Sequence, residues 1–166
     1  MILGMSIGAF TLLHVIITLV AIGSGLIVVG GMFASHRLPA TTALFLFTTA
    51  LTSVTGFLFP IRGFTPALGV GIVACVVLAV ALFALYKERL AGAWRPIYVI
   101  TAIVSLYLNV FVLVVQSFAK VSGLNALAPT QSEPPFAITQ AAVLAIFILI
   151  ALIALVKFRP ATAVRV

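Results

Sequence analysis

Five long apolar segments, separated by short stretches rich in Pro, Gly and charged residues, dominate the sequence. A helix needs about 20 residues to cross roughly 30 Å of hydrocarbon. The segments reach that length at residues 8–33, 41–60, 67–87, 96–119 and 136–157. This pattern predicts an all-α fold, a polytopic membrane helical bundle with five transmembrane helices in a single domain over residues 1–166.

Polar residues cross the fourth segment at steps of three and four, which puts them on one face of a helix. In order, they are Tyr98, Thr101, Ser105, Asn109, Gln116 and Lys120. Unpaired polar groups cost free energy in hydrocarbon, so this face is expected to contact the other helices. We expect Asn109 and Ser105, with Thr52 of the second segment, to act as polar helix-packing residues.

The first and last segments differ from each other in how many small and polar residues they carry. One face of the first carries small and polar residues, at positions Thr11, His14, Thr18, Ala21 and Gly25. Small residues let membrane helices approach closely, so this face is expected to pack against its neighbours. The last segment is almost entirely Ala, Leu, Ile and Val after Gln140, which is typical of a helix at the edge of a bundle.

Composition supports a membrane protein. The chain is 64% hydrophobic and 7% charged, with a mean hydropathy of +1.41, which leaves too little polar surface for a soluble globule. The net charge of +7 comes from cations spread singly among apolar runs, so nucleic acid is not an expected partner. The single cysteine, Cys75, excludes an internal disulfide.

Lys and Arg collect on one side of the predicted membrane. That side holds Arg37, Lys87, Arg89, Arg95, Lys157, Arg159 and Arg165. The other side holds only Arg62 and Lys120. Because cytoplasmic loops carry the excess of positive residues, the N-terminus is predicted outside and the C-terminus in the cytoplasm.

A group of polar residues is predicted at one depth near the outer surface. Counting about 1.5 Å per residue puts His14 roughly 9 Å below the outer boundary, and Thr55, Gln116 and Gln140 about 6–8 Å below it. The outer loops could cover this level with Arg62 and Glu133. Two interpretations stay open: a ligand-binding pocket with His14 as base, hydrogen-bond donor or metal ligand, or a hydrogen bond from His14 to a glutamine that locks the first and fourth segments.

Several chemistries are disfavoured by missing residues. Both acids, Glu88 and Glu133, lie in loops, whereas a proton-coupled pump usually has a carboxylate inside the membrane. The two histidines, His14 and His36, are 22 residues apart, roughly 33 Å along a helix, so one haem cannot bridge them. No phosphate-binding loop, nucleophile elbow or HExxH motif occurs in a usable context. A quinone, a haem held by one ligand, or a path for a small neutral solute remains.

The runs LYLNVFVLVVQSF, LNALAPTQSEPPF and TGFLFPIRGFTPA carry a likeness that extends over the second to fifth segments and most of both outer loops. In these runs the chain resembles a group of small, uncharacterised polytopic proteins of the bacterial inner membrane. The resemblance implies that location and carries no activity.

The first functional hypothesis is a non-catalytic protein, either an accessory subunit of a larger membrane complex or a self-associating bundle, with the lipid bilayer as its surroundings. A second is a binding or redox-support module that holds a quinone, haem or other hydrophobic ligand around His14. A third is a channel or facilitator for a small solute. No catalytic residue is identified, which favours a role other than that of an enzyme.

Overall fold

The computed structural model describes residues 1–60, 63 and 66–160, and these residues form helices and no strand. The elements are α1 (Ile7–Phe33), α2 (Pro39–Phe57), α3 (Pro66–Leu82), the π-helical turn η1 (Phe83–Lys87), α4 (Trp94–Lys120), α5 (Ser122–Leu127) and α6 (Pro134–Lys157). Five helices, with α3 and η1 counted together, are long and apolar enough to cross a membrane. The predicted all-helical class and the five apolar spans are therefore confirmed.

The end of the second helix differs from the prediction, and two short elements were not predicted. The second helix was expected to reach residue 60, but α2 ends at Phe57. Pro60 disfavours helical geometry in the residue before it, and the Leu58 amide instead donates to the Thr55 carbonyl in a tight turn. The short helix α5 and the widening of α3 into η1 were not predicted. The hydrophobic pattern has no signal for either, because a single turn is too short to show a period.

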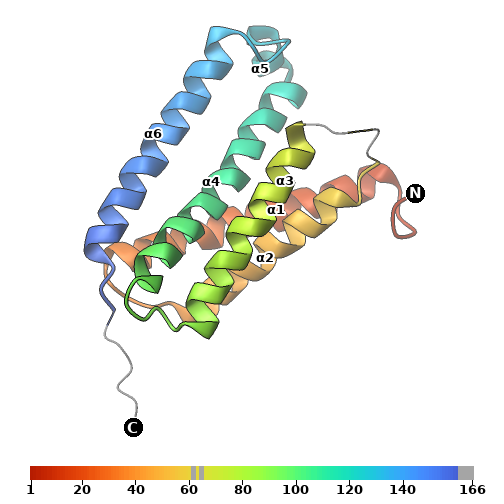
Figure 1. Cartoon of the computed structure of the whole chain (residues 1–166). Coiled ribbons are helices and arrows are strands. Elements are labelled where there is room, and N and C mark those ends of the chain that lie inside the picture. Colours follow the sequence, from red (N-terminus) through yellow and green to blue (C-terminus); the bar gives the residue numbers. More distant parts are fainter. Residues whose placement is uncertain (61–62, 64–65, 161–166) are drawn as a thin grey trace.

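The α4 helix occupies the centre of the bundle. It contacts α1, α2, α3, α5 and α6, whereas in the described part of the chain α6 contacts mainly α4 and, less extensively, α1. Figure 1 shows that α1 and α2 form one pair, that α4 and α6 form another, and that the two pairs cross and diverge. The outer position of α6 agrees with the prediction of an edge helix.

The helices converge at one end and spread apart at the other (Figure 1). We call the first the basic end, because it carries Arg37, Lys87, Arg89, Arg95, Lys157 and Arg159. We call the second the splayed end; α1 begins there, α2 and α4 end there, and α5 lies there. This divergence decides which of the polar residues meet.

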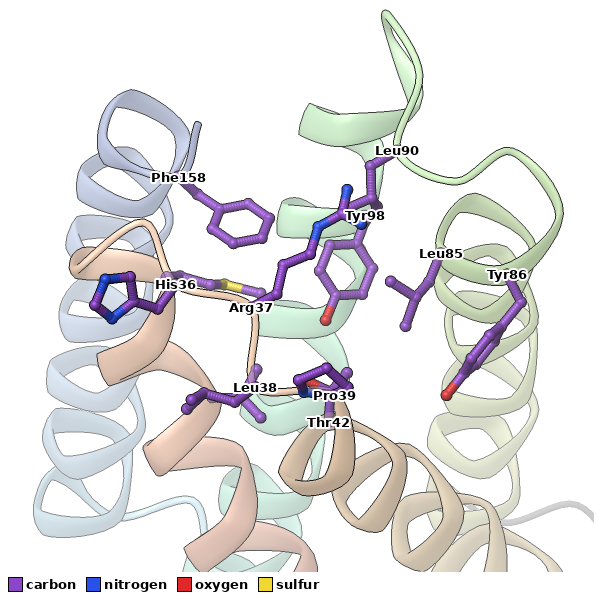
Figure 2. A pocket seen from close by; sticks show the side chains of 12 residues that line it. His36, Arg37, Leu38, Pro39, Thr42, Leu85, Tyr86, Leu90, Tyr98 and Phe158 are labelled. Carbon is purple, nitrogen blue, oxygen red and sulfur yellow. The ribbon is translucent and has the colours of Figure 1, made fainter. Parts of the chain in front are cut away.

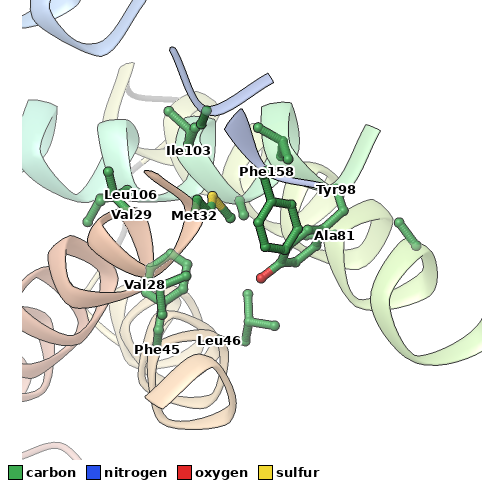
Figure 3. Packing of buried hydrophobic residues seen from close by; sticks show 14 of the residues in the cluster. Val28, Val29, Met32, Phe45, Leu46, Ala81, Tyr98, Ile103, Leu106 and Phe158 are labelled. Carbon is green, nitrogen blue, oxygen red and sulfur yellow. The ribbon is translucent and has the colours of Figure 1, made fainter. Parts of the chain in front are cut away.

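Most of the buried hydrophobic cluster lies toward the basic end. Figure 3 shows side chains from four helices and from the segment after α6 interlocking there, among them Val28, Met32, Phe45, Leu46, Ala81, Tyr98, Ile103, Leu106 and Phe158. Tyr98 is one of the largest fully buried side chains, with 2% of its surface exposed. The basic end is thus the firmly packed part of the molecule, because interlocked side chains hold helices together where hydrophobicity gives no preference over lipid.

Small residues on α1 allow this packing. Thr18, Ala21 and Gly25 are buried, as predicted for that face. A Cβ atom at Gly25 would lie 2.7 Å from Leu106 Cδ1 and 2.9 Å from Phe45 Cε2. Glycine therefore lets the α1 backbone approach α4 and α2 at the same point.

Candidate functional site

His14 joins α1 to α2 at the splayed end. Its Nδ1 atom lies 2.7 Å from Thr55 Oγ1, and Thr55 Oγ1 lies 2.7 Å from the Leu51 carbonyl. The only hydroxyl proton of Thr55 is donated to that carbonyl, so we assign the proton of the His14 contact to Nδ1. The Phe59 ring packs edge-on against the imidazole, with ring centroids 5.4 Å apart. His14 is therefore a tie between the two helices, with Nε2 left as an acceptor.

The two glutamines of the predicted pocket lie elsewhere. Gln140 Nε2 donates to the Phe111 carbonyl at 3.2 Å and links α6 to α4, while its Oε1 is buried without a hydrogen-bond partner in the described part of the chain. Gln116 is exposed. Within the described ranges no hydrogen bond joins either glutamine to His14, so the interpretation that His14 bonds a glutamine is wrong. The glutamines are separated from His14 sideways, because α1 and α2 diverge from α4 and α6 at this end (Figure 1).

Glu133 and Arg62 are the two outer-loop residues that were predicted to cover the pocket. Glu133 accepts hydrogen bonds from the Thr130 amide at 3.2 Å and from the Ser132 amide at 3.1 Å, which orders the loop before α6. Desolvation raises the pKa of Glu133, but the hydrogen bonds from Thr130 and Ser132 outweigh it and hold the pKa below its ordinary value. Arg62 lies outside the described residues.

Two of the three packing residues make contacts between helices. Asn109 Nδ2 donates to Thr49 Oγ1 at 3.2 Å and links α4 to α2. The hydroxyl oxygens of Thr52 and Thr18 are 3.3 Å apart and link α2 to α1. Ser105 is buried, but its hydroxyl has no hydrogen-bond partner among the described residues, so it contributes small size rather than a hydrogen bond.

A double-mutant cycle measures the His14 tie. We expect His14→Ala and Thr55→Val to lose less stability together than the sum of the two single losses, with a coupling energy of about 1 kcal/mol. The measurement is the thermal midpoint of the detergent-solubilised protein for the four members of the cycle. Additive losses would show that the contact contributes no free energy.

Two adjoining cavities open at the basic end instead. The first, of about 220 Å³, is lined mainly by apolar side chains, with Tyr98 and Thr42 among its polar residues. Figure 2 shows the Tyr98 hydroxyl pointing toward Thr42 and the Arg37 side chain extending toward Leu90. The second, of about 440 Å³, is lined by Arg37, Leu90, Gly92, Arg95, Arg159 and Pro160. Arg37 and Leu90 line both cavities, so the two cavities adjoin each other.

Local structure brings the three arginines to one place. The α1 helix ends in a Schellman motif, in which the His36 amide donates to the Gly31 carbonyl at 2.8 Å and Ser35 adopts a φ of 57°. The Ser35 hydroxyl accepts the Arg159 amide at 2.9 Å. This contact holds the segment after α6 against the loop that carries Arg37.

Arg95 completes the arrangement from α4. Its Nη1 atom donates to the Phe158 carbonyl at 2.8 Å. A cation is favourable there, because Phe158 is the C-terminal cap of α6 and the helix dipole is negative at that end. Arg159 directly follows Phe158 in the chain, so this bond places Arg95 beside Arg159.

We call the second cavity the arginine cavity. Among its described lining residues, no acid balances the positive charge of the arginines. Over residues 1–60, 63 and 66–160, no ion pair joins an arginine of the cavity to a carboxylate, and no Asp or Glu lines either space. Like charges that share a cavity repel one another. A bound anion would remove that repulsion, and guanidinium groups match carboxylate and phosphate geometry.

Unusual backbone surrounds the same cavities. The π-helical turn η1 supplies Leu85 and Tyr86 to the apolar cavity. Arg89 and Leu90 follow it with φ values of 52° and 64°, in the left-handed region that costs a non-glycine residue about 1–2 kcal/mol. Such features tend to occur at functional sites, so they agree with a site at this end.

The sequence interpretation used these cations only as topology signals. A local signal was present: Arg95 and Arg159 each directly precede a proline, and Arg37 precedes Pro39 by two residues. The three positions lie in separate loops or helix ends, so their convergence was not visible along the chain.

Comparison of the chain with models of protein families, with curated proteins and with solved structures finds no match.

Proposed function

We propose that this chain is a non-catalytic protein of a bacterial inner membrane that binds an anionic lipid at its basic end. The observation that carries the proposal is the pair of adjoining cavities, one lined by Arg37, Arg95 and Arg159 and the other by apolar side chains around Tyr98. An anionic head group fits the first and the beginning of its acyl chain fits the second. Basic pockets between membrane helices are known head-group sites.

A lipid can reach the apolar cavity from the side. Pro39 and Tyr86 line it and are both exposed at the edge of the bundle. They belong to the start of α2 and to η1, so two different elements bring exposed residues to the lining of this cavity. Lateral entry suits an occupant that is itself a component of the bilayer.

The orientation fits the same proposal. The basic end carries the excess of Lys and Arg, so we place it, with the C-terminus, on the cytoplasmic side. The two arginine–proline pairs then lie at the level of the head groups. Assembly with itself or with a larger membrane complex is compatible with lipid binding.

The test compares two arginine variants. Arg37→Gln is expected to weaken binding of anionic lipid about tenfold, because a charge-assisted hydrogen bond contributes about 1.5–3 kcal/mol and 1.4 kcal/mol is a factor of ten. Arg37 makes no side-chain hydrogen bond to the described part of the chain, so the fold should survive the change. Binding is measured by native mass spectrometry of the detergent-solubilised protein titrated with phosphatidylglycerol.

Arg89→Gln is the matched control. Arg89 lies at the same end but lines neither cavity, so its loss should change binding less than twofold. An equal loss in both variants would indicate general attraction to a basic surface and would contradict a specific site.

A further inference from the structure

We infer that the head group held at the basic end is a terminal phosphate, as in a lipid phosphomonoester, rather than a phosphodiester or a carboxylate. This inference rests on the proposed lipid-binding function and specifies its ligand. It follows from the number of guanidinium groups among the described residues that line the cavity, from the separate elements that carry them, and from the absence of an acid among those residues.

The number of guanidinium groups selects the shape of the anion. Arg37 comes from the loop between α1 and α2, Arg95 from the first turn of α4, and Arg159 from the segment after α6. A guanidinium binds best when two of its N–H groups meet two oxygens of one anion. A terminal phosphate has three free oxygens and so offers three such edges, whereas a phosphodiester or a carboxylate offers one.

Donors remain for all three contacts. Arg95 uses Nη1 on the Phe158 carbonyl, and Arg159 uses Nε on the Val156 carbonyl at 3.2 Å. Each guanidinium carries five N–H donors, so both keep free donors after these bonds. Arg37 makes no such bond to the residues that the structure describes, so all of its donors are available.

The charge points to the same group. Among the described residues, three arginines and no acid line the space. A phosphate monoester carries a charge of about −1.5 to −2 at neutral pH and has three strong acceptor oxygens. A diester carries a single charge, so it would leave more of the repulsion between the arginines uncompensated.

The adjoining apolar cavity indicates that the phosphate is attached to an apolar chain. Its lining includes Val28, Met32, Leu85 and Phe158, and it meets the arginine cavity at Arg37 and Leu90. A free phosphate would use only the arginine cavity. A lipid phosphate uses both, and its chain reaches the bilayer past Tyr86 and Pro39.

The experiment compares two lipids with identical acyl chains. The whole chain in detergent is titrated with dioleoyl phosphatidic acid and with dioleoyl phosphatidylglycerol, and each dissociation constant is measured by native mass spectrometry. We expect phosphatidic acid to bind at least tenfold more tightly. Equal binding that Arg37→Gln still weakens would overturn the terminal-phosphate assignment and leave the proposed function standing. Binding of neither lipid, or binding that ignores Arg37→Gln, would overturn both.

Two further arms separate geometry and source. Arg37→Lys keeps the charge but loses the planar pair of donors, so the preference for phosphatidic acid should fall about threefold or more while phosphatidylglycerol binding is retained. An unchanged preference for phosphatidic acid would contradict the arrangement in which each guanidinium pairs with two oxygens of the phosphate. Inorganic phosphate should not displace phosphatidic acid when present at a hundredfold excess; full displacement would show that a soluble phosphate compound, not a lipid, is the ligand.

Discussion

Tyr98→Ala is expected to lower the free energy of unfolding by about 3 kcal/mol, the largest effect of any single side chain at the basic end. Tyr98 is almost completely buried, and its ring packs near Phe158, with centroids 6.2 Å apart. Removing it enlarges a cavity that already exists and takes contacts from α1, α2 and the segment after α6. Alanine cannot recover those contacts, because the surrounding backbone is held by the loops at that end.

Tyr86→Ala is the matched control for this change. It removes the same side chain at the same end, but Tyr86 is 57% exposed and faces the edge of the bundle. The measurement is the thermal midpoint in detergent, taken from the fraction of protein that stays monodisperse after heating. A loss of 3 kcal/mol corresponds to roughly 6–12 °C for a chain of this size. Similar losses for both variants would contradict the central role of the Tyr98 core.

Gly25→Val is expected to be the second most damaging change, at about 2–3 kcal/mol. The first added atom would already lie 2.7 Å from Leu106 Cδ1 and 2.9 Å from Phe45 Cε2. Both neighbours are 1% exposed, so neither side chain has free space into which it can move. The α1 helix must then shift away from α2 and α4, and the loop that carries Arg37 shifts with it.

Gly23→Val tests whether the cause is this close approach. Gly23 lies two residues earlier in the same helix, and an added Cβ there would meet nothing within 4 Å. Its replacement should be neutral or slightly stabilising, since glycine is a poor helix former. The same thermal measurement applies. A loss of stability at Gly23 equal to that at Gly25 would point to a general need for glycine in α1.

The sequence predicted the helices well because their cause is local. The spans depend on the length of each apolar run, and the loops on Pro, Gly and charge, all of which are read directly along the chain. The polar face of the fourth segment gave a partly correct result: α4 contacts most of the other helices and Tyr98, Ser105 and Asn109 are buried, but Gln116 and Lys120, toward the C-terminal end of α4, are exposed. A face with polar groups must be covered in a membrane, whichever neighbour covers it.

The candidate site was predicted at the opposite end from the cavities. Depth along a helix can be counted from the sequence, and on that basis His14, Thr55, Gln116 and Gln140 share one level. In the described structure, the hydrogen bond within this group joins His14 to Thr55. Depth gives no lateral position, and the crossing of the α1–α2 pair with the α4–α6 pair separates groups at the same depth (Figure 1).

The sequence by itself determined the number of apolar helices, the central place of α4 and the concentration of cations at one end. Only the tertiary structure decided that Arg37, Arg95 and Arg159 line one cavity. That convergence depends on the turn at Ser35, on the bond from Arg95 to the Phe158 carbonyl and on the crossing angle of the helices. These are contacts between residues far apart in the chain, and they arise from packing, which no local pattern encodes.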